Sequence, residues 1–421
     1  MRGIEWLILP YAEAEFLGQI WERRALHIPT AGDGTVSELV GDLDLEEILW
    51  RSCRTWGEVS LAKPTFSAAT TSFTRDPPSL PILRAAYRDG YTLVVNNLER
   101  KHLGVARLCR AAEAFFGAQC NVNLYLTGPA TQGLAPHYDD QDGFVIQLQG
   151  EKTWSLHDSG PLLPLDTAPY RAPTLQDSIG GTQVRLRPND VLYVPRGMVH
   201  AAKALDHASL HLTLAVSTPR WLAVLQRTLA RLAEKHVALR RGLPPATFSG
   251  DSLPEAEYAE ELCGIVTSSL TRDELTQTIC EMRKQFAASL DPLPARSDGS
   301  VPFCGEVTVN SLVQRAANLV VSRLCSDDQI VLTFLGAECV FPLSVAEALD
   351  TVLSGVVFSA AELPGVMSAK EKLRLVRLMV DYGALERVQV KDRSATSTVV
   401  SCPPQRAAEP FRRSHTPSRF T

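Results

Sequence analysis

The chain has 421 residues, of which 45% are hydrophobic and 21% charged. This length suits two or three domains with a sizeable core, and the composition excludes a wholly disordered or fibrous protein. The net charge of -5 gives little support for direct nucleic-acid binding through bulk charge. No apolar run reaches the roughly 18–20 residues of a membrane span, so we expect no membrane partner. The start is not typical of a signal peptide, and the scattered cysteines without a C-x-x-C pair indicate free thiols in a reducing cytoplasm.

Residues 1–217 begin with helical patterns and then change to strand-like runs. Helices are expected over 12–23 and 44–50. Strands are expected over 91–95, 120–126, 143–149, 153–156, 182–186, 190–194 and 207–216. We expect the third and fourth of these strands to form one hairpin, and the fifth and sixth to form another. Many short strands with Gly, Pro and Asn between them are typical of a β-sandwich or barrel.

Residues 218–300 are mainly helical. Thr218 followed by Pro219 is typical of a helix start. An apolar stripe at helical spacing follows in Leu222, Leu225, Leu229 and Leu232. The stripe is either core or a dimer face, and periodicity alone favours core. Further helices are expected up to Leu290, and residues 291–300 are typical of a linker.

Residues 301–392 mix strands and helices. Strands are expected over 329–334, 339–342 and 385–390. Ser344 is expected to cap one helix, and Ser368 with Glu371 forms a capping box for another. Residues 393–421 are rich in Ser, Thr, Pro and Arg, which predicts a disordered tail.

The segment PHYDDQDGFVIQLQGEKTW, residues 136–154, contains possible metal ligands. His137 and Asp139 are two residues apart, and on a strand such residues point to the same face. A third ligand, His200, follows in NDVLYVPRGMVHAA, residues 189–202. Two histidines and one carboxylate form the facial triad of non-haem Fe(II) oxygenases, which leaves positions for a 2-oxo acid and O2. A His-x-Asp pair also arises by chance with the histidine in a core, but the third ligand favours the metal interpretation.

Lys152 lies one strand further on, and Trp154 and Leu156 share its strand face. A buried lysine is costly without a partner, and the distal carboxylate of 2-oxoglutarate would supply one. The alternative is a surface lysine whose stem covers apolar residues. The neighbouring triad favours the cosubstrate interpretation.

These segments resemble the JmjC-type ribosomal oxygenases, a cupin-fold family of Fe(II)- and 2-oxoglutarate-dependent protein hydroxylases. The matching strings are FLGQIWERRALHIP (16–29), DGYTLVVNNLER (89–100), NLYLTGPATQGLAPHYDDQDGFVIQLQGEKTW (123–154), NDVLYVPRGMVHAA (189–202) and SLHLTLAV (209–216). The resemblance implies a double-stranded β-helix (jelly roll) with N-terminal helices in residues 1–217. It further implies an α-helical dimerisation region in 218–300 and a winged-helix-like domain in 301–392.

The resemblance also implies roles for single residues in the expected site. Its metal ligands for Fe(II) would be His137, Asp139 and His200. Lys152 would bind the distal carboxylate of 2-oxoglutarate, and Asn123 corresponds to a polar position near that cosubstrate. Tyr125 and Ser209 correspond to positions that contact the substrate residue, with a barrel-wall aromatic and an ordinary strand serine as the alternatives. His211 would belong to the barrel wall and not to the metal site.

The implied reaction is hydroxylation of a protein or peptide side chain, with O2 as a second cosubstrate and succinate and CO2 as coproducts. Arginine or histidine of a ribosomal protein is the expected target. One alternative is a biosynthetic-pathway hydroxylase of a precursor peptide or small metabolite, which would carry the same motifs. Another is a non-catalytic cupin-like binding module, although the retained site residues argue against it. A histone demethylase is less favoured because nothing resembles a chromatin-reading module. The resemblance also favours a homodimer formed by the leucine stripe.

Overall fold

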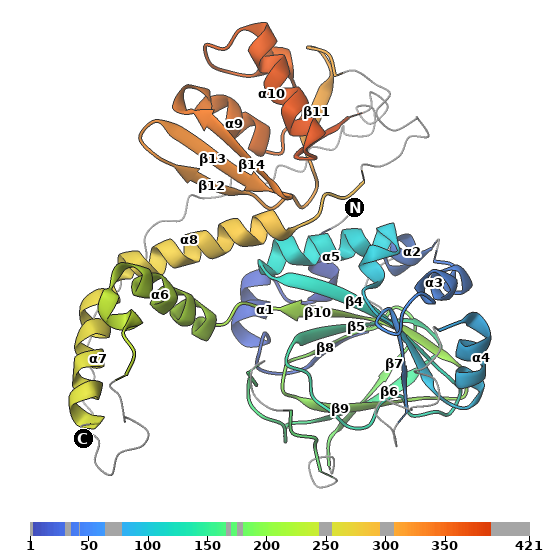
Figure 1. The fold of residues 1–421 in the computed structure, drawn as a ribbon. Helices are drawn as coiled ribbons and strands as arrows, with labels where there is room; N and C mark the ends of the chain where they lie inside the picture. The colour runs from blue at the N-terminus through green and yellow to red at the C-terminus, as the bar shows by residue number, and fades with distance from the viewer. Residues whose placement is uncertain are drawn as a thin grey trace.

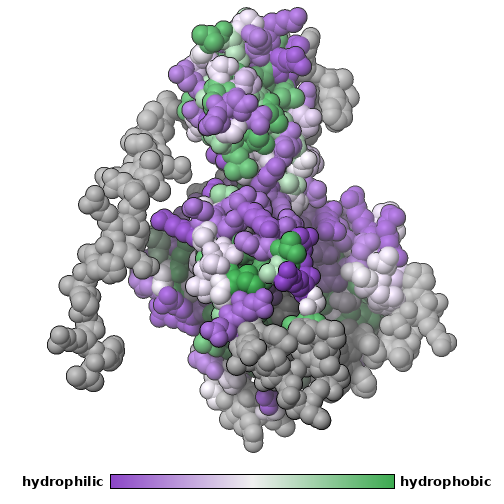
Figure 2. Space-filling view, turned by 60° about the vertical axis from the view of Figure 1, so that its left-hand side comes forward, coloured by the Kyte–Doolittle hydropathy of each residue, from purple (hydrophilic) through white to green (hydrophobic). Residues whose placement is uncertain are grey.

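The structure is a computed structural model, and it describes residues 3–29, 35–41, 43–63, 78–165, 170–174, 180–243, 255–294 and 307–388. A β-sandwich with helices against one of its sheets forms the first part of the chain (Figure 1). A helical segment follows, and its long helix α8 (Arg272–Ser289) leads to a C-terminal α/β unit. Figure 2 shows the C-terminal unit as a separate lobe above the sandwich.

Two antiparallel sheets build the sandwich. The larger sheet has the strand order β1-β8-β5-β10-β4-β3-β2. Its strands span, in that order, Leu26–Ile28, Val191–Val194, Asp142–Gln149, Ser209–Ser217, Gln119–Thr127, Thr92–Val95 and Val59–Ala62. The smaller sheet has the order β7-β6-β9, with strands Thr182–Leu186, Lys152–His157 and Val199–Ala204. This arrangement confirms the predicted jelly roll.

The expected strands are present, but both expected hairpins are wrong. β5 pairs with β10 and β8, whereas β6 pairs with β7 and β9. β7 and β8 likewise belong to different sheets. In a jelly roll the chain crosses between the two sheets at such turns. Gly150 makes one of them with φ +65°, and a Cβ at this position would lie 2.0 Å from the carbonyl oxygen of Ala208.

Strand β10 shows how alternation separates the core from the site. Leu212 and Leu214 are fully buried in the main core, which the N-terminal residues and helix α5 (Leu103–Phe116) share. Successive strand residues point to opposite faces. His211 and Thr213 therefore point between the two sheets.

The N-terminal helices cover the large sheet. Besides α5 they are α1 (Glu13–Gln19), α2 (Thr35–Val40), α3 (Leu45–Ser52) and α4 (Leu80–Arg88). The helix expected over 12–23 is shorter than predicted, because α1 ends at Gln19 and Glu22 has φ +57°. The helix expected over 44–50 is confirmed as α3, and the Asp44 carboxylate accepts hydrogen bonds from the first-turn amides.

The helical segment consists of α6 (Trp221–Lys235), α7 (Glu255–Ser269) and α8. The predicted helix start at Thr218 is wrong. Strand β10 continues to Ser217, and Arg220 occupies the cap position of α6. Among the described residues, no helix is long and apolar enough to cross a membrane.

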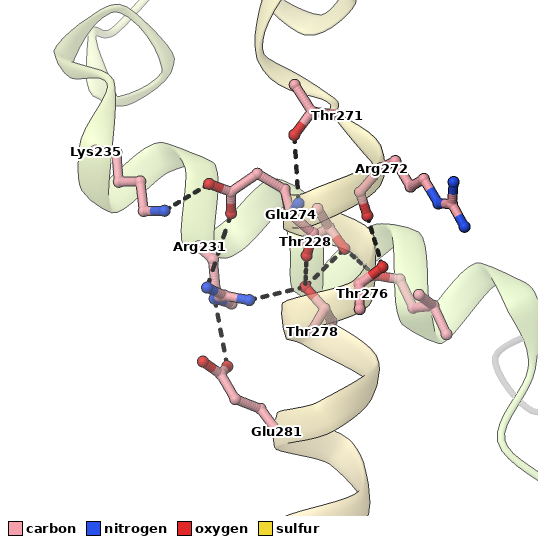
Figure 3. A network of polar contacts seen from close by, with 10 residues as sticks. Thr228, Arg231, Lys235, Thr271, Arg272, Glu274, Thr276, Thr278 and Glu281 are labelled. Carbon is pink, nitrogen blue, oxygen red and sulfur yellow. Dashed lines mark hydrogen bonds and ion pairs between the residues drawn. The ribbon is translucent and has the colours of Figure 1, made fainter. Parts of the chain in front are cut away.

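Helix α6 packs against α8 through polar side chains (Figure 3). Thr228 donates a hydrogen bond to Thr278 at 2.9 Å, and Arg231 forms an ion pair with Glu281 at 3.3 Å. Most of the leucine stripe is exposed on the surface of α6. Leu222, Leu225 and Leu229 are 38%, 41% and 38% exposed, whereas Leu232 is buried. Among the described residues, three of the four leucines are therefore surface residues, and the interpretation of the stripe as core is wrong for them.

The C-terminal unit contains two three-stranded sheets and has a core of its own. One sheet is β12-β13-β14 (Ser322–Cys325, Gln329–Phe334, Ala337–Pro342), and the other is β15-β11-β16 (Phe358–Ser359, Leu312–Arg315, Leu385–Arg387). Its helices are α9 (Ala346–Leu353) and α10 (Ala369–Asp381).

The two helix caps predicted in this unit differ in outcome. The capping box of α10 is confirmed, because the Ser368 amide donates to the Glu371 carboxylate at 2.8 Å. Ser344 is not the cap of α9, since it lies in the preceding 3-10 turn Leu343–Val345. The predicted tail over 393–421 lies outside the described residues, as does the linker beyond residue 294.

Candidate metal centre

The three predicted ligands converge beside the start of β9. His200 is the second residue of β9, and the backbone of His137 pairs with it through two N–H···O bonds of 2.8 and 3.1 Å. Asp139 Oδ2 lies 3.6 Å from His200 Nε2, and Asp139 Oδ1 lies 4.0 Å from His137 Nε2. The ligand atoms of the three residues all lie within 4.8 Å of one another. This spacing fits one ion with metal–ligand bonds of about 2.0–2.2 Å.

The predicted strand geometry of the first two ligands is only partly right. Residues 128–141 are irregular, apart from single bridges at Gln132 and His137. Asp139 is held instead by the turn before β9, where the Gly197 amide donates to the Asp139 carbonyl at 2.8 Å. The backbone of His137 is thus attached to β9, and the backbone of Asp139 is attached to the turn before it. These two attachments bring the ligands together.

Backbone carbonyls orient both imidazole rings. His137 Nδ1 lies 2.8 Å from Ala135 O, and His200 Nδ1 lies 3.0 Å from Met198 O. A carbonyl can only accept, so each Nδ1 carries the proton and each Nε2 keeps its lone pair toward Asp139. Burial lowers the pKa of His200, the charge of His137 lowers it further, and Asp139 opposes both. His200 is therefore neutral, which is the form that binds a metal ion.

Lys152 lies between the sheets with only 2% of its surface exposed. Its Nζ donates to Thr127 Oγ1 at 2.8 Å and lies 3.5 Å from Nδ1 of His211. No carboxylate among the described residues forms an ion pair with this ammonium, and burial lowers the pKa of Lys152 to about 7. The surface-lysine alternative is thus wrong. An external anion would compensate the cost of burying this charge.

Tyr125 and Asn123 lie on β4, the strand that precedes the ligand segment. The Tyr125 ring stacks on His211 with 4.8 Å between ring centres and 5° between their planes. Burial raises the pKa of Tyr125 to about 12, and the nearby charge of Asp139 adds to it. Asn123 Oδ1 accepts a hydrogen bond from the Asn97 amide at 3.1 Å. Tyr125 therefore lies near the triad, and Asn123 lies two residues further back along the strand.

Ser209 is fully buried at the start of β10. Its Oγ accepts a hydrogen bond from Gln147 Nε2 at 2.8 Å, and its register partner on β4 is Thr127. Its described hydrogen bond is thus within the sandwich and not with the triad. A role in substrate contact stays a prediction for this residue.

Three residues that connect the triad to Lys152 were not predicted as site residues. Trp154 lies with its ring centre 5.7 Å from those of both His200 and His211, and its buried Nε1 has no hydrogen-bond partner among the described residues. The other two are Thr127 and His211, which contact Lys152 directly. Strand alternation could have found them, because Thr127 follows Tyr125 by two residues and His211 follows Ser209 by two.

A double-stranded β-helix with this triad beside one strand is the architecture of a JmjC domain. The family model described as "JmjC domain" matches residues 95–224 of the chain. The JmjC resemblance found in the sequence motifs is therefore confirmed for this part, which contains all three ligands and Lys152.

The chain is similar to curated insect proteins named bifunctional lysine-specific demethylase and histidyl-hydroxylase NO66. The Drosophila erecta protein is 33% identical over 263 residues, which cover 59% of this chain and 39% of the relative. The Drosophila melanogaster protein is 29% identical over 310 residues, which cover 68% of this chain and 47% of the relative. The chain thus spans less than half the length of these relatives.

Solved structures of YcfD, a ribosomal oxygenase from Escherichia coli, share the fold. One of them, in complex with cobalt and 2-oxoglutarate, has a TM-score of 0.50 at 16% identity, covering 90% of this chain and 99% of that chain. A second YcfD structure has a TM-score of 0.51 over the same shares. The matched 90% of the chain is more than the sandwich alone, so the similarity in fold extends beyond the sandwich.

Proposed function

We propose that this chain is an Fe(II)- and 2-oxoglutarate-dependent oxygenase that hydroxylates a protein or peptide side chain. The observation that carries the proposal is the pairing of two features within one sandwich. His137, Asp139 and His200 form a ligand set with open positions. Lys152 offers a buried ammonium that has no carboxylate partner among the described residues. The Trp154 ring centre lies 5.7 Å from the ring centres of His200 and of His211, and His211 contacts Lys152.

The residues present fit the cosubstrate that this chemistry needs. When bound, iron and 2-oxoglutarate together supply the oxidising chemistry that converts 2-oxoglutarate, O2 and a C–H bond to succinate, CO2 and an alcohol. Lys152 and Thr127 would hold the distal carboxylate, and Asn123 would lie near the cosubstrate. The buried rings of Trp154 and His211 would exclude water from the space between.

We further propose that Tyr125 and Ser209 contact the substrate residue. Tyr125 has the stronger support, because its pKa is influenced by Asp139 and its ring is fixed against His211. Ser209 would need to exchange its hydrogen bond with Gln147 for one with the substrate. The variants Tyr125→Phe and Ser209→Ala should each raise the KM for a peptide substrate. Each should change succinate formation in the absence of peptide to a smaller extent.

The proposed substrate is a histidine or arginine side chain of a ribosomal protein. Support comes from the names of the similar proteins, which include a histidyl-hydroxylase and a ribosomal oxygenase. The same names include a lysine-specific demethylase. Both activities oxidise a C–H bond, so the product distinguishes them: hydroxylation adds 16 Da and demethylation removes 14 Da.

The test measures succinate formed from 2-oxoglutarate under air with Fe(II), for the unaltered chain, His137→Ala and His207→Ala. His207 is an exposed histidine outside the cluster and serves as the matched control. We expect His137→Ala to abolish turnover and His207→Ala to preserve it. Intact-protein mass spectra of ribosomal proteins incubated with the enzyme should then show a gain of 16 Da. Equal turnover in all three chains would contradict the proposal, and absence of both turnover and metal binding would favour a non-catalytic module.

We also propose that the chain forms a homodimer through helix α6. Three stripe leucines are exposed, and Trp221 beside them is 82% exposed, while the polar face of α6 is used against α8. Monomers seldom expose contiguous apolar patches of this kind. In Figure 2, where this side of the molecule comes forward, green and white side chains interrupt the purple surface. A two-fold axis would let the stripe pair with itself.

Sedimentation tests the dimer. Leu225→Glu with Leu229→Glu should convert a dimer to a monomer at micromolar concentration, whereas Leu343→Glu, at a 40% exposed leucine of the C-terminal unit, should not. A monomeric unaltered chain, or a dimer that survives the double substitution, would refute the proposal.

The domain boundaries follow from the same proposal. Residues 1–217 would be the catalytic domain, 218–300 the dimerisation region, and 301–392 a winged-helix-like scaffold. The two helices and the strand after α10 support the last assignment. The cytoplasm would suit the seven described cysteines, all of which are free thiols.

A further inference from the structure

A polar cluster with two buried members lies close along the chain to two of the metal ligands and has no part in the function proposed above. It consists of Asp142, Tyr193, Arg196 and Glu22, called here the Asp142 cluster. Asp142 is 1% exposed, and its Oδ1 accepts a hydrogen bond from the Tyr193 hydroxyl at 2.6 Å. The same hydroxyl accepts from the Glu22 amide at 2.8 Å, and Arg196 donates to the Glu22 carboxylate at 2.6 Å.

The Asp142 cluster joins the two segments that carry the ligands. Asp142 is the first residue of β5, and it directly follows the irregular segment 128–141 that contains Asp139. Arg196 lies in the turn that leads to His200, and its amide donates to Asp142 Oδ1 at 3.4 Å. The next amide, that of Gly197, donates to the Asp139 carbonyl. The carboxylate of Asp142 and the carbonyl of Asp139 therefore attach to consecutive amides of the same turn.

The cluster is costly to maintain, which indicates a use. Burial raises the pKa of Asp142 to about 6, although Tyr193 and Arg196 oppose the shift. Asp142 Oδ2 and Arg196 Nε are buried without a hydrogen-bond partner among the described residues. Glu22 has φ +57°, a backbone conformation that non-glycine residues seldom adopt. Core packing alone would be served better by apolar residues at these positions.

We propose that Asp142 is a positioning residue for the metal centre, acting through the Arg196–Gly197 turn. By holding the ends of both segments on one turn, it sets the separation of Asp139 and His200 before any ion binds. The inference rests on the proposed function, since it assumes that the triad binds a divalent metal. Residues that orient metal ligands in this way change metal affinity by about 10–100-fold when they are replaced.

The experiment compares Co(II) binding to the full chain and to three variants, by calorimetry and by the visible absorption spectrum of the bound Co(II). Asp142→Asn removes the charge and keeps the shape. Tyr193→Phe removes only the hydroxyl that links Asp142 to Glu22, and it remains informative if Asp142→Asn does not fold. Asp190→Asn is the matched control, because Asp190 is also a buried carboxylate of the sandwich but binds His27 and the Arg187 amide.

We expect Asp142→Asn to weaken Co(II) binding by about 10–100-fold and to alter the spectrum, and Tyr193→Phe to do the same to a smaller extent. Asp190→Asn should bind Co(II) like the unaltered chain, with the same spectrum. Unchanged binding and spectrum in both Asp142→Asn and Tyr193→Phe would overturn the inference alone, as would an equal loss in Asp190→Asn. Failure of the unaltered chain to bind Co(II) would instead overturn the proposed function, and the inference with it.

Discussion

Replacing Lys152 by methionine should move ligand affinity and protein stability in opposite directions. Methionine keeps most of the length and apolar character of lysine but removes the ammonium. A hydrogen bond to a charged group contributes about 1.5–3 kcal/mol, so the dissociation constant for 2-oxoglutarate should rise by about 10–100-fold. The charged lysine itself is unfavourable in the empty site, because burial lowers its pKa from 10.5 to about 7.

The sign of the stability effect follows from this pKa. Below pH 7 the lysine is protonated in both the folded and the unfolded chain, and the full cost of burying the charge is present. Between pH 7 and pH 10.5 the lysine has lost its proton in the folded chain but keeps it in the unfolded chain. The cost of burying the charge therefore decreases as the pH rises through this range. A pKa difference of this size corresponds to roughly 5 kcal/mol as an upper bound. Lys152→Met should therefore raise the free energy of unfolding at pH 6 by about 2–4 kcal/mol without ligand.

Two measurements check the pair of effects. Calorimetry with Mn(II) and 2-oxoglutarate without O2 gives the affinity, and urea unfolding of the ligand-free chain gives the stability. Lys203→Met is the control, because Lys203 is an exposed lysine paired with Thr153 on the strand of Lys152. It should change neither quantity. If Lys152→Met binds 2-oxoglutarate as tightly as the unaltered chain, or is less stable, the assignment of Lys152 as an anion-binding residue is refuted.

Since the bound dicarboxylate needs a charged Lys152, its dissociation constant should rise about tenfold per pH unit above pH 7; calorimetry from pH 6.5 to 8.5 should find this slope lost in Lys152→Met. Gly197→Ala should lower both stability and Co(II) affinity, because Gly197 has φ +84° and a Cβ would lie 2.0 Å from the Pro161 carbonyl oxygen; thermal unfolding equal to that of the unaltered chain would contradict this. Co(II) at 100 times its dissociation constant should raise the free energy of unfolding by about 2.7 kcal/mol, an effect that a chelator should abolish in urea titrations.

The sequence predicted that His137, Asp139 and His200 converge, but not the way in which they meet. The spacing of His137 and Asp139 suggested a strand, because residues two apart share a strand face. The structure reaches the same convergence through an irregular segment, held by backbone bonds to His200 and Gly197. Local spacing cannot reveal such bonds, since they join segments about 60 residues apart along the chain. The sequence therefore indicated which residue types could bind a metal ion, but not the backbone contacts that bring them together.

The pairing of the strands shows a related limit. Alternation and turn residues located β5, β6, β7 and β8, but assigned them to two hairpins. A glycine with positive φ serves a hairpin and a crossing between sheets equally well, and Gly150 makes a crossing. The cross-sheet contacts of Lys152 with Thr127 and His211 depend on this topology. Reading the two strands as a hairpin would have placed the ammonium differently.

Helix α6 shows that periodicity identifies an apolar face without identifying what covers it. The leucine spacing is that of a core-facing helix, and the same helix carries Thr228 and Arg231 at positions where a surface is expected. In the structure these polar residues are the ones that meet α8 (Figure 3), through a buried threonine pair and an ion pair. A helix that uses its polar face for an internal contact leaves its apolar face exposed, as three of the stripe leucines of α6 are. Burying the two threonine hydroxyls there, while three leucines stay exposed, has a physical reason if the stripe is itself covered in the dimer proposed above.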